Sequence, residues 1–253
     1  NVMYLVASEI VKIVSGMTWD EFLKVNVFNK INMKNSTSIS NERETNANIA
    51  RPHIGNDNFE KVAVEQEKGD NMAAAGFIYS SVNDMVNYMR LLLHDGIFER
   101  DTIVTKSVIN EIFKPQIIFP LFDPPIHNEF TSYGLGWWVT SKNGHKIIEH
   151  SGGIDGMAAN LVMINDLNVG IIVLTNTDEI VPFLMTFKLL EQIFDDKSYD
   201  LYDYLKKLRA ISITDKKLNK EKLDRSRIKH TKPSLDLKLY AGIYNDNMYG
   251  DIL

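Results

Sequence analysis

The sequence contains no cysteine, and no apolar run approaches the roughly 18 residues that a membrane-spanning helix needs. Without cysteine there is neither a disulfide framework nor a thiolate nucleophile, and the redox compartment stays open. The 6 histidines do not combine with Asp or Glu at ligand spacing, so we expect no metal and no cofactor. The formal net charge of −5 argues against nucleic acid as a partner.

The charge is unevenly distributed along the chain. Residues 206–238 hold 12 Lys or Arg against 4 Asp or Glu, whereas the remaining residues hold 16 and 29. A basic stretch with few apolar residues is typical of a solvated linker, here lying against an acidic body. Contact with nucleic acid or anionic lipid is the alternative interpretation. Membrane association and oligomeric state stay open.

Residues 134–176 show strand patterns separated by turn signals. Apolar and aromatic residues fill 135–139, 147–148, 157–164 and 169–174, which predicts an antiparallel meander of four short strands. We interpret His150-Ser151-Gly152-Gly153 as its second turn. Residues 169–174 are apolar throughout, which favours a central strand covered on both faces. His145 and His150 are five positions apart, so on a regular strand they face opposite sides and cannot share a metal.

Other segments have helical spacing with end signals. A capping box begins a helix at Thr18–Glu21 and another at Ser81–Asp84, and Gly16 and Gly96 are stops. Further helices are predicted for 2–15, for 105–113 and after Pro182. The buried face of the helix after Ser81 is predicted to comprise Val82, Met85, Val86, Met89, Leu92 and Leu93. We predict a long loop for residues 35–71. Residues 115–125 are predicted to be an irregular apolar segment that forms either a wall beside a cleft or a segment packed against the body of the domain.

Several of these segments occur in a recognisable order. Residues 31–37 (INMKNST) precede residues 73–80 (AAAGFIYS), and residues 133–138 (YGLGWW) precede His150-Ser151-Gly152 and a strand ending in LTN at 174–176. This order resembles the serine β-lactamase and penicillin-binding-protein superfamily, in its class C-like branch of esterases, D-amino peptidases and carboxypeptidases. In that frame Asn1 is the last residue of a Tyr-x-Asn motif, and residues 150–152 are the third motif, with His150 in place of lysine. Phe77 stands where a second Gly is usual.

The resemblance implies an α+β fold, with an antiparallel sheet flanked by helices and truncated at its N-terminus, followed by the start of a small β module. It divides the chain into a hydrolase domain at 1–205, a basic linker at 206–236 and the β module at 237–253. It implies acyl transfer on a small-molecule ester, amide or peptide, and a periplasmic or cell-surface location.

The resemblance also implies roles for individual residues. Asn1, His150 and Gly153 are the candidate catalytic residues, with Ser151 and Gly152 binding substrate. His150 would hold a substrate carboxylate or tune the motif tyrosine, and Gly152 must lack a side chain so that substrate can lie against the strand. The N–H of Gly153 would be one of two oxyanion donors.

The nucleophile is missing from this scheme. Only Ser226-Arg-Ile-Lys229 fits Ser-x-x-Lys, and it follows the third motif, inside the basic stretch, instead of preceding Asn1. None of the 10 tyrosines begins a Tyr-x-Asn, and no Gly-x-Ser-x-Gly is present. We therefore expect a fragment of a serine hydrolase, inactive by itself; a non-catalytic binding or scaffolding domain is the alternative. A Ser-x-x-Lys and a tyrosine upstream of Asn1 would decide between them.

Overall fold

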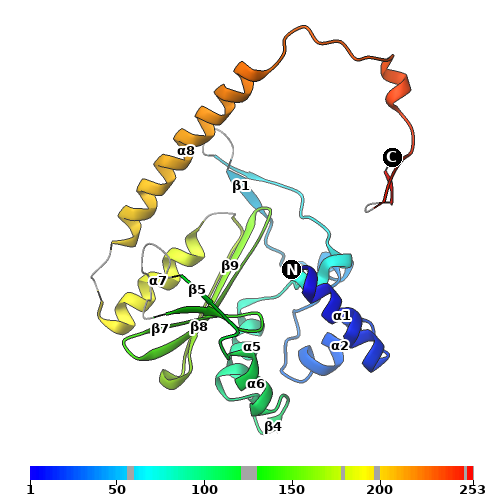
Figure 1. The fold of residues 1–253 in the computed structure, drawn as a ribbon. Helices are drawn as coiled ribbons and strands as arrows, with labels where there is room; N and C mark the ends of the chain where they lie inside the picture. The colour runs from blue at the N-terminus through cyan, green and yellow to red at the C-terminus, as the bar shows by residue number, and fades with distance from the viewer. Residues whose placement is uncertain (56–59, 121–129, 178–179, 197–199, 248–249, 253) are drawn as a thin grey trace. The chain divides into compact units, whose positions relative to one another are not determined.

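The computed structural model describes the chain except for residues 56–59, 121–129, 178–179, 197–199, 248–249 and 253. Two compact units are present, Asn1–Leu201 and Tyr202–Leu253. The first unit is built on a six-stranded sheet in which every neighbouring pair is antiparallel (Figure 1). In spatial order its strands are β10 (Val169–Thr175), β9 (Met157–Ile164), β8 (His145–Ile154), β7 (Trp138–Lys142), β6 (Thr131–Tyr133) and β5 (Ile117–Phe119).

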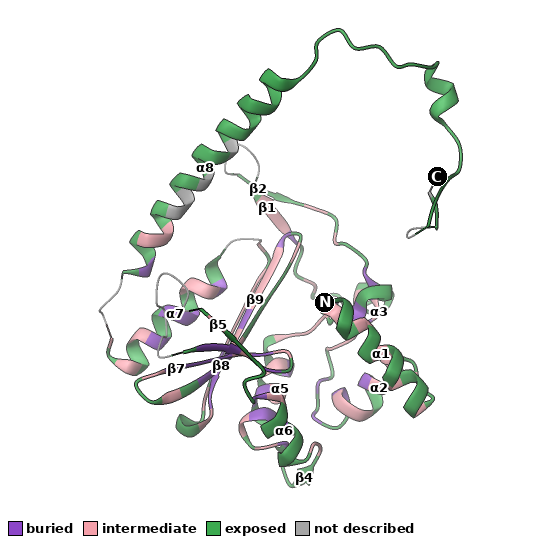
Figure 2. Cartoon of the chain, in the orientation of Figure 1, coloured by how far each residue is buried: buried purple, intermediate pink, exposed green. Residues whose placement is uncertain are grey.

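Helices cover both faces of this sheet, because its strands carry apolar residues on both sides. The neighbours Ile147 and Ile148 are both fully buried and point to opposite faces. Ile148 belongs to a cluster with Met89 and Leu92 of α5 (Val82–Leu93). Ile147 belongs to a cluster with Leu190 of α7 (Val181–Phe194). Figure 2 shows the buried residues concentrated on these strands and on the helix faces against them. The predicted α+β class is confirmed.

The remaining elements of the first unit are short, apart from the N-terminal helix. Gly16 ends that helix in the left-handed conformation, with φ 71°, and Thr18 with Glu21 forms the predicted capping box of the next helix. These elements are α1 (Val2–Ser15), α2 (Trp19–Leu23), the π-helical turn η1 (Lys24–Phe28), α3 (Ser40–Glu44), β1 (His53–Gly55), β2 (Lys61–Ala63), η2 (Asp70–Met72), α4 (Ala73–Gly76), β3 (Ile97–Phe98), β4 (Asp101–Thr102), α6 (Lys106–Ile112) and η3 (Asn165–Leu167).

Two strand predictions need correction. Strand β10 is covered by α5 and α7 on its two faces, but it lies at the end of the described sheet and not at its centre. An apolar strand sequence indicates only that both faces of the strand are covered. Helices can cover both faces of an edge strand just as they cover those of a central strand. Residues 117–119 form strand β5, paired with β6, where an irregular wall was predicted; the part of that wall at 121–125 lies outside the described residues.

The helix after Ser81 also differs from its prediction. Ser81 accepts the expected hydrogen bond from the Asp84 backbone N–H, at 3.3 Å. The buried Asp84 carboxylate accepts instead from the Asn35 backbone and the Ser36 hydroxyl, each at 2.7 Å. Val82 and Val86 are 47% and 41% exposed, so the buried face is narrower than predicted. The carboxylate therefore ties the loop at 35–36 to the helix.

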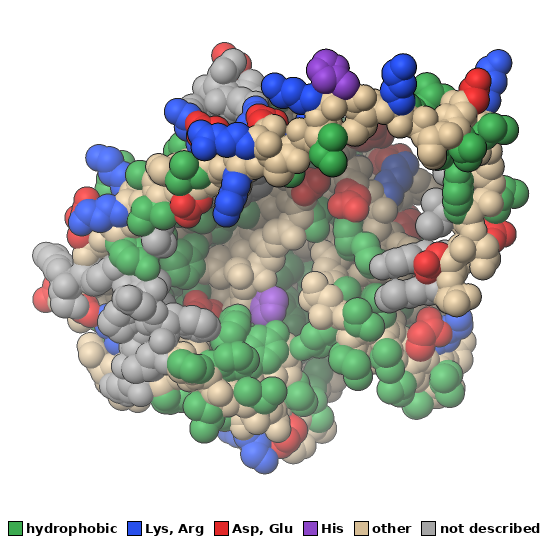
Figure 3. All heavy atoms as spheres, turned by 45° about the horizontal axis from the view of Figure 1, so that its top comes forward, with side chains coloured by type: hydrophobic (Ala, Val, Ile, Leu, Met, Phe, Trp, Pro, Cys, Tyr) green, Lys and Arg blue, Asp and Glu red, His purple; other side chains and the backbone are tan. Residues whose placement is uncertain are grey.

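The second unit contains α8 (Leu201–Ser226) from Tyr202 onward, η4 (Leu237–Tyr240), and the paired strands β11 (Tyr244–Asp246) and β12 (Gly250–Ile252). The stretch predicted as a basic linker is thus largely one solvated helix, rich in Lys and Arg (Figure 3, blue spheres in the upper part). Among the described helices no single one has the length and apolar composition to cross a membrane. The pair α1 with Trp19–Phe28 passes that test only when joined across a bend of 76°.

Candidate active site

The predicted site residues 150–153 lie within strand β8 and not in a turn. Strand β8 runs from His145 to Ile154, and its pairing with β9 continues to Ile154↔Met157. The turn is Asp155-Gly156, where Gly156 has φ 74°. Asp-Gly between two apolar runs is the strongest short hairpin signal, and it places the turn correctly. The prediction placed the turn at the wrong position because it relied on the two glycines at 152–153.

One edge of β8 is open at these residues. The pairing of β8 with β7 ends at Glu149↔Trp138, and in the described part of the chain no strand pairs with that edge from His150 to Ile154. In an antiparallel hairpin with a two-residue turn, the pair next to the turn is hydrogen-bonded and the pairs alternate from there. The N–H groups of Ser151 and Gly153 therefore point away from β9, toward the open edge. Residues 151–153 are exposed.

The open edge borders a groove of about 1100 Å³. Its floor includes Gly152, Gly153 and Leu161 of strands β8 and β9, and its walls come from the loops around 33–36, 43–50 and 76–81. A Cβ added at Gly152 would have no atom within 4 Å. The position therefore faces open space, and a side chain there would occupy the groove.

His150 lies beside two aromatic residues that sequence reasoning did not assign to the site. Its Nε2 is 3.2 Å from the Tyr133 hydroxyl, and the Trp137 ring meets it edge-on with centroids 6.4 Å apart. Burial lowers the pKa of His150, and a hydrogen bond to the Ser151 backbone opposes this decrease. The imidazole is therefore predominantly neutral at neutral pH. The YGLGWW motif was the available signal for Tyr133.

Two glycines hold the Tyr133–Trp137 segment in place. A Cβ at Gly134 would lie 2.5 Å from the Ile112 carbonyl oxygen, and the Leu135 N–H donates to that oxygen at 3.0 Å. Gly136 has φ 87°, and a Cβ there would lie 3.2 Å from the Tyr4 hydroxyl of α1. Burial, and after it the neighbouring Tyr4, raises the pKa of the Tyr133 hydroxyl to about 12. The first turn of α1 thus lies against the His150 cluster.

Asn1, the remaining predicted catalytic residue, is the N-cap of α1, and its side chain makes no capping hydrogen bond. It precedes Tyr4 by about one helical turn, so both residues lie on the same side of the helix. The structure therefore brings His150, Ser151, Gly152 and Gly153 together on one strand, and places Asn1 on the helix whose Tyr4 reaches their cluster.

Glu149 precedes His150 and points to the opposite face of the sheet. It is half-buried, directly opposite Trp138 on β7 and Val162 on β9. Burial raises the pKa of its carboxyl group to about 7. The group consequently gains and loses its proton near neutral pH.

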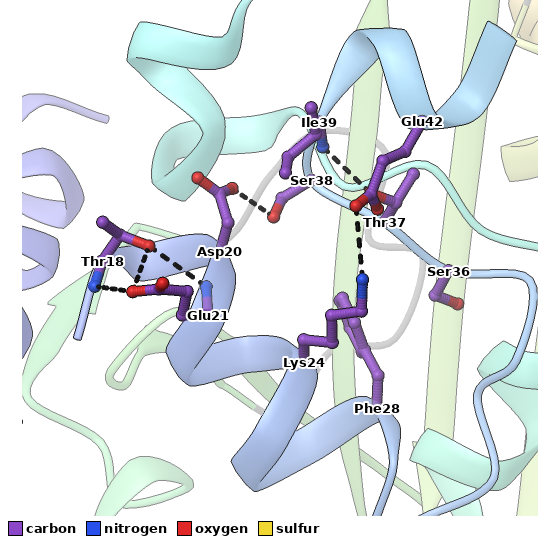
Figure 4. Close-up of a pocket in the computed structure, with 10 residues that line it drawn as sticks. All are labelled: Thr18, Asp20, Glu21, Lys24, Phe28, Ser36, Thr37, Ser38, Ile39 and Glu42. Atoms are coloured by element: carbon purple, nitrogen blue, oxygen red, sulfur yellow. Dashed lines mark hydrogen bonds and ion pairs between the residues drawn. The ribbon is translucent and has the colours of Figure 1, made fainter.

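A second cavity, of about 290 Å³, lies between α2 and the loop at 36–42 (Figure 4). Its polar side chains bond one another: Lys24 donates to Glu42 at 3.2 Å, Thr37 donates to Glu42 at 2.8 Å, and Ser38 donates to Asp20 at 2.5 Å. These bonds fasten the loop to the helix. These polar groups already have hydrogen-bond partners, so we interpret the cavity as part of the contact between the loop and the helix.

The other sequence candidates have structural contacts. His145 Nδ1 lies 2.5 Å from an Asp166 carboxylate oxygen, and among the described residues no group of three His, Asp or Glu could hold a metal. Ser226 is the last residue of α8, and its hydroxyl donates to the Leu223 carbonyl at 2.9 Å. A nucleophilic serine of this motif begins its helix, so Ser226 lacks the required setting.

Comparisons with known proteins agree with one another on the protein family and the fold. A family scan matches residues 1–188 to the family described as Beta-lactamase. The unguisins hydrolase ungD of Aspergillus violaceofuscus is 23% identical over 99% of this chain and 48% of its own length. The octameric penicillin-binding protein homologue from Pyrococcus abyssi has a TM-score of 0.67 at 22% identity, over 76% of this chain and 41% of that one.

The D-amino acid amidase from Ochrobactrum anthropi SV3, solved with L-phenylalanine amide, has a TM-score of 0.58 at 19% identity, over 77% of this chain and 56% of that one. At these identities the solved structures show the fold alone. The chain spans about half the length of the relatives it matches.

Proposed function

The chain belongs to the β-lactamase family, whose match covers residues 1–188, and on that premise we propose that it forms the C-terminal part of the catalytic domain of a serine hydrolase. In the complete protein, a serine outside this chain attacks the carbonyl carbon of an ester or amide. The alcohol or amine leaves, and an acyl-enzyme remains on the serine oxygen. Water then adds to the acyl carbon and releases the acid.

The open edge of β8 at residues 150–154, of which Gly152, Gly153 and Ile154 line a groove, is the observation that carries this proposal. An extended acyl compound can lie along an unpaired strand edge and hydrogen-bond to its backbone. The N–H of Gly153 points to that edge and supplies a donor for the carbonyl oxygen as it gains charge. Loss of one such donor costs about 3–4 kcal/mol in the transition state. Gly152 leaves room for the substrate because it has no side chain.

The substrate class follows from the groove and the relatives. The groove is lined by apolar residues together with polar ones that include Lys34, Glu42 and Arg43, which suits an amide, ester or short peptide with both apolar and polar substituents. Two of the relatives carry the words hydrolase and amidase in their names. We propose a small amide or peptide as the natural substrate class, with esters as accessible analogues.

Catalysis requires groups that residues 1–253 do not supply. The proposed nucleophile and its base are the Ser and Lys of a Ser-x-x-Lys motif upstream of Asn1, together with a tyrosine two residues before Asn1. His150 and the Gly153 N–H act on the substrate that this serine attacks. Residues 1–253 by themselves are therefore expected to show no turnover of esters, amides or β-lactams.

The substitution Gly152→Ala tests the proposed binding edge. Because a Cβ at Gly152 meets nothing within 4 Å, the variant should fold as stably as the parent while its methyl group occupies the groove. Hydrolysis of p-nitrophenyl esters and amino-acid amides by the complete protein should fall by about a hundredfold.

Gly55→Ala is the matched control. Gly55 also lies in a strand, and the nearest atom to an added Cβ is the Lys61 ammonium nitrogen at 3.9 Å. Its activity and melting temperature should stay unchanged. Full activity in Gly152→Ala would contradict the assignment of this edge to substrate. Absence of hydrolysis in the unsubstituted complete protein would favour the non-catalytic binding domain.

A further inference from the structure

Two segments of the groove wall are fastened side by side by backbone hydrogen bonds. The Thr37 N–H donates to the Tyr79 carbonyl oxygen at 3.0 Å, and the Tyr79 N–H donates to the Thr37 carbonyl oxygen at 2.8 Å. The next opposed residues are Ser36 and Ser80, whose hydroxyl oxygens lie 2.7 Å apart. Both serines are half-buried, and both line the groove that the open edge of β8 borders. The positions of their two protons therefore determine what this part of the wall offers to a bound molecule.

The proton of Ser36 is used on Asp84. The Ser36 hydroxyl donates to Asp84 Oδ2 at 2.7 Å, and the Asn35 backbone N–H donates to the same oxygen, also at 2.7 Å. Asp84 is only 3% exposed, and it belongs to helix α5, which packs against the sheet. A serine hydroxyl has one proton to donate and two lone pairs to accept with. Ser36 can therefore only accept in its contact with Ser80.

Ser80 is consequently the donor in its bond with Ser36, and its oxygen keeps its lone pairs. The Ser81 carbonyl oxygen, 3.5 Å from the Ser80 oxygen, is too distant to compete with a partner at 2.7 Å. Among the described residues no further donor is bonded to the Ser80 oxygen. The neighbouring Thr37 hydroxyl differs, because it donates to Glu42 at 2.8 Å and accepts at 3.1 Å from the backbone N–H two residues further on. Ser80 thus presents an acceptor, and not a donor, to the groove.

We infer that Ser80 is a specificity-determining residue of the groove, whose oxygen accepts a hydrogen bond from a nitrogen-bound hydrogen in the acyl part of the substrate. This inference rests on the proposed function and narrows its substrate class. The donor is an amide N–H or an ammonium group, because both carry hydrogen on nitrogen. An ester oxygen at the same place has no hydrogen to donate, and its lone pairs would meet those of Ser80. The groove therefore prefers acyl groups with an N–H at this position over matched groups with an oxygen.

Three matched compounds test this preference by their binding to residues 1–253, which needs no hydrolysis. They are the p-nitroanilides of phenylalanine, of N-acetylphenylalanine and of O-acetyl-3-phenyllactic acid, which offer an ammonium, an amide N–H and an ester oxygen at the same place. Dissociation constants come from titrations followed by ¹H–¹⁵N NMR. One of the two nitrogen compounds should bind about fivefold more tightly than the ester compound, and its identity tells an ammonium from an amide N–H. In Ser80→Ala this difference should disappear.

Ser36→Ala gives a second test, because it keeps the Ser80 hydroxyl and removes the acceptor of its proton. That proton can then turn toward the bound compound, so the preference for an N–H should be lost although the hydroxyl remains.

Ser107→Ala is the matched control. The Ser107 hydroxyl also shares a hydrogen bond with a second hydroxyl, that of Thr105 at 3.0 Å, but Ser107 is exposed on α6 and is not among the described residues that line the groove. The variant should keep the preference of the parent. Equal binding of all three compounds by the parent, or an unchanged preference in Ser80→Ala, would overturn the inference. If Ser80→Ala folds poorly, the parent and Ser36→Ala still decide the question.

The release of p-nitroaniline by the complete protein separates this inference from the proposed function. The preferred nitrogen compound should have a KM about fivefold lower than the ester compound, and Ser80→Ala should remove this difference while kcat changes little, because Ser80 binds the acyl part away from the reacting bond. Selective binding without any hydrolysis would support the role of Ser80 and contradict the proposed function. Hydrolysis of all three compounds with equal KM would leave the proposed function standing and overturn the role of Ser80, as would a failure of both proteins to bind any of them.

Discussion

Replacement of Glu149 by glutamine should make the folded chain more stable at alkaline pH. The carboxyl group is half-buried on strand β8, between Trp138 of β7 and Val162 of β9. Ionising it in that position removes a charge from water, which is unfavourable. Glutamine has nearly the same shape and no charge. The substitution therefore removes the ionisation and leaves the packing in place.

The size of the effect follows from the pKa of Glu149. Burial raises this pKa to about 7 from an ordinary 4.5, and the difference corresponds to about 3 kcal/mol. The folded chain holds the proton more tightly than the unfolded chain does. This contribution to stability is therefore complete below the unfolded pKa of 4.5 and is lost as the pH rises through about 7. The glutamine variant has no such loss.

The assay is urea unfolding followed by tryptophan fluorescence at about pH 5, where most of this contribution is present, and at about pH 9, where it is lost. Trp138 lies opposite Glu149 and reports on the same part of the sheet. The variant should gain about 3 kcal/mol relative to the parent between the two pH values. Glu111→Gln, at an exposed position on α6, removes the same charge and should show no comparable gain. An equal pH dependence of parent and Glu149→Gln would refute the reasoning.

Two further substitutions test how the site is supported. Gly156→Ala should lower the free energy of unfolding by more than about 2 kcal/mol, and the melting temperature with it. Gly156 has φ 74°, and a Cβ there would lie 2.6 Å from Pro52 and 2.7 Å from the His53 nitrogen. An unchanged melting temperature would contradict the geometry of this turn. Asp84→Ala should lower the free energy of unfolding by about 2–3 kcal/mol, measured by urea titration, since it removes the acceptor of the Asn35 N–H and one of the two partners of the Ser36 hydroxyl. Asp84→Asn keeps one acceptor oxygen and should cost less; equal losses would argue against this role.

Much of the fold could be predicted because its signals are local. The left-handed Gly16, the Thr18–Glu21 capping box and the apolar runs of β9 and β10 each depend on residues close in sequence. The order of the motifs identified the family, which the match over residues 1–188 confirms. Similar local reasoning misplaced the β8–β9 turn, because Gly152-Gly153 was weighed above Asp155-Gly156.

The features that were missed depend on contacts distant in sequence. Tyr133 and His150 are 17 positions apart and meet only because β6, β7 and β8 are neighbours in the sheet. The open edge of β8 arises where β7 ends, which the pattern of β8 itself does not contain. Helix α8 is rich in charged residues, but its Lys and Leu residues favour helix and it carries the i,i+4 ion pair Asp203–Lys207. The basic composition of this stretch led to the prediction of a linker, although its residues favour a helix.

The most direct test of the account is to identify the acylated residue. The complete protein and residues 1–253 would each be treated with a fluorophosphonate or an activated ester, and the modified serine located by peptide mass spectrometry. We predict a single labelled serine in the complete protein, outside residues 1–253 and within a Ser-x-x-Lys, and no labelling of residues 1–253 alone. Labelling of a serine within residues 1–253, or no labelled serine in the complete protein, would contradict the account.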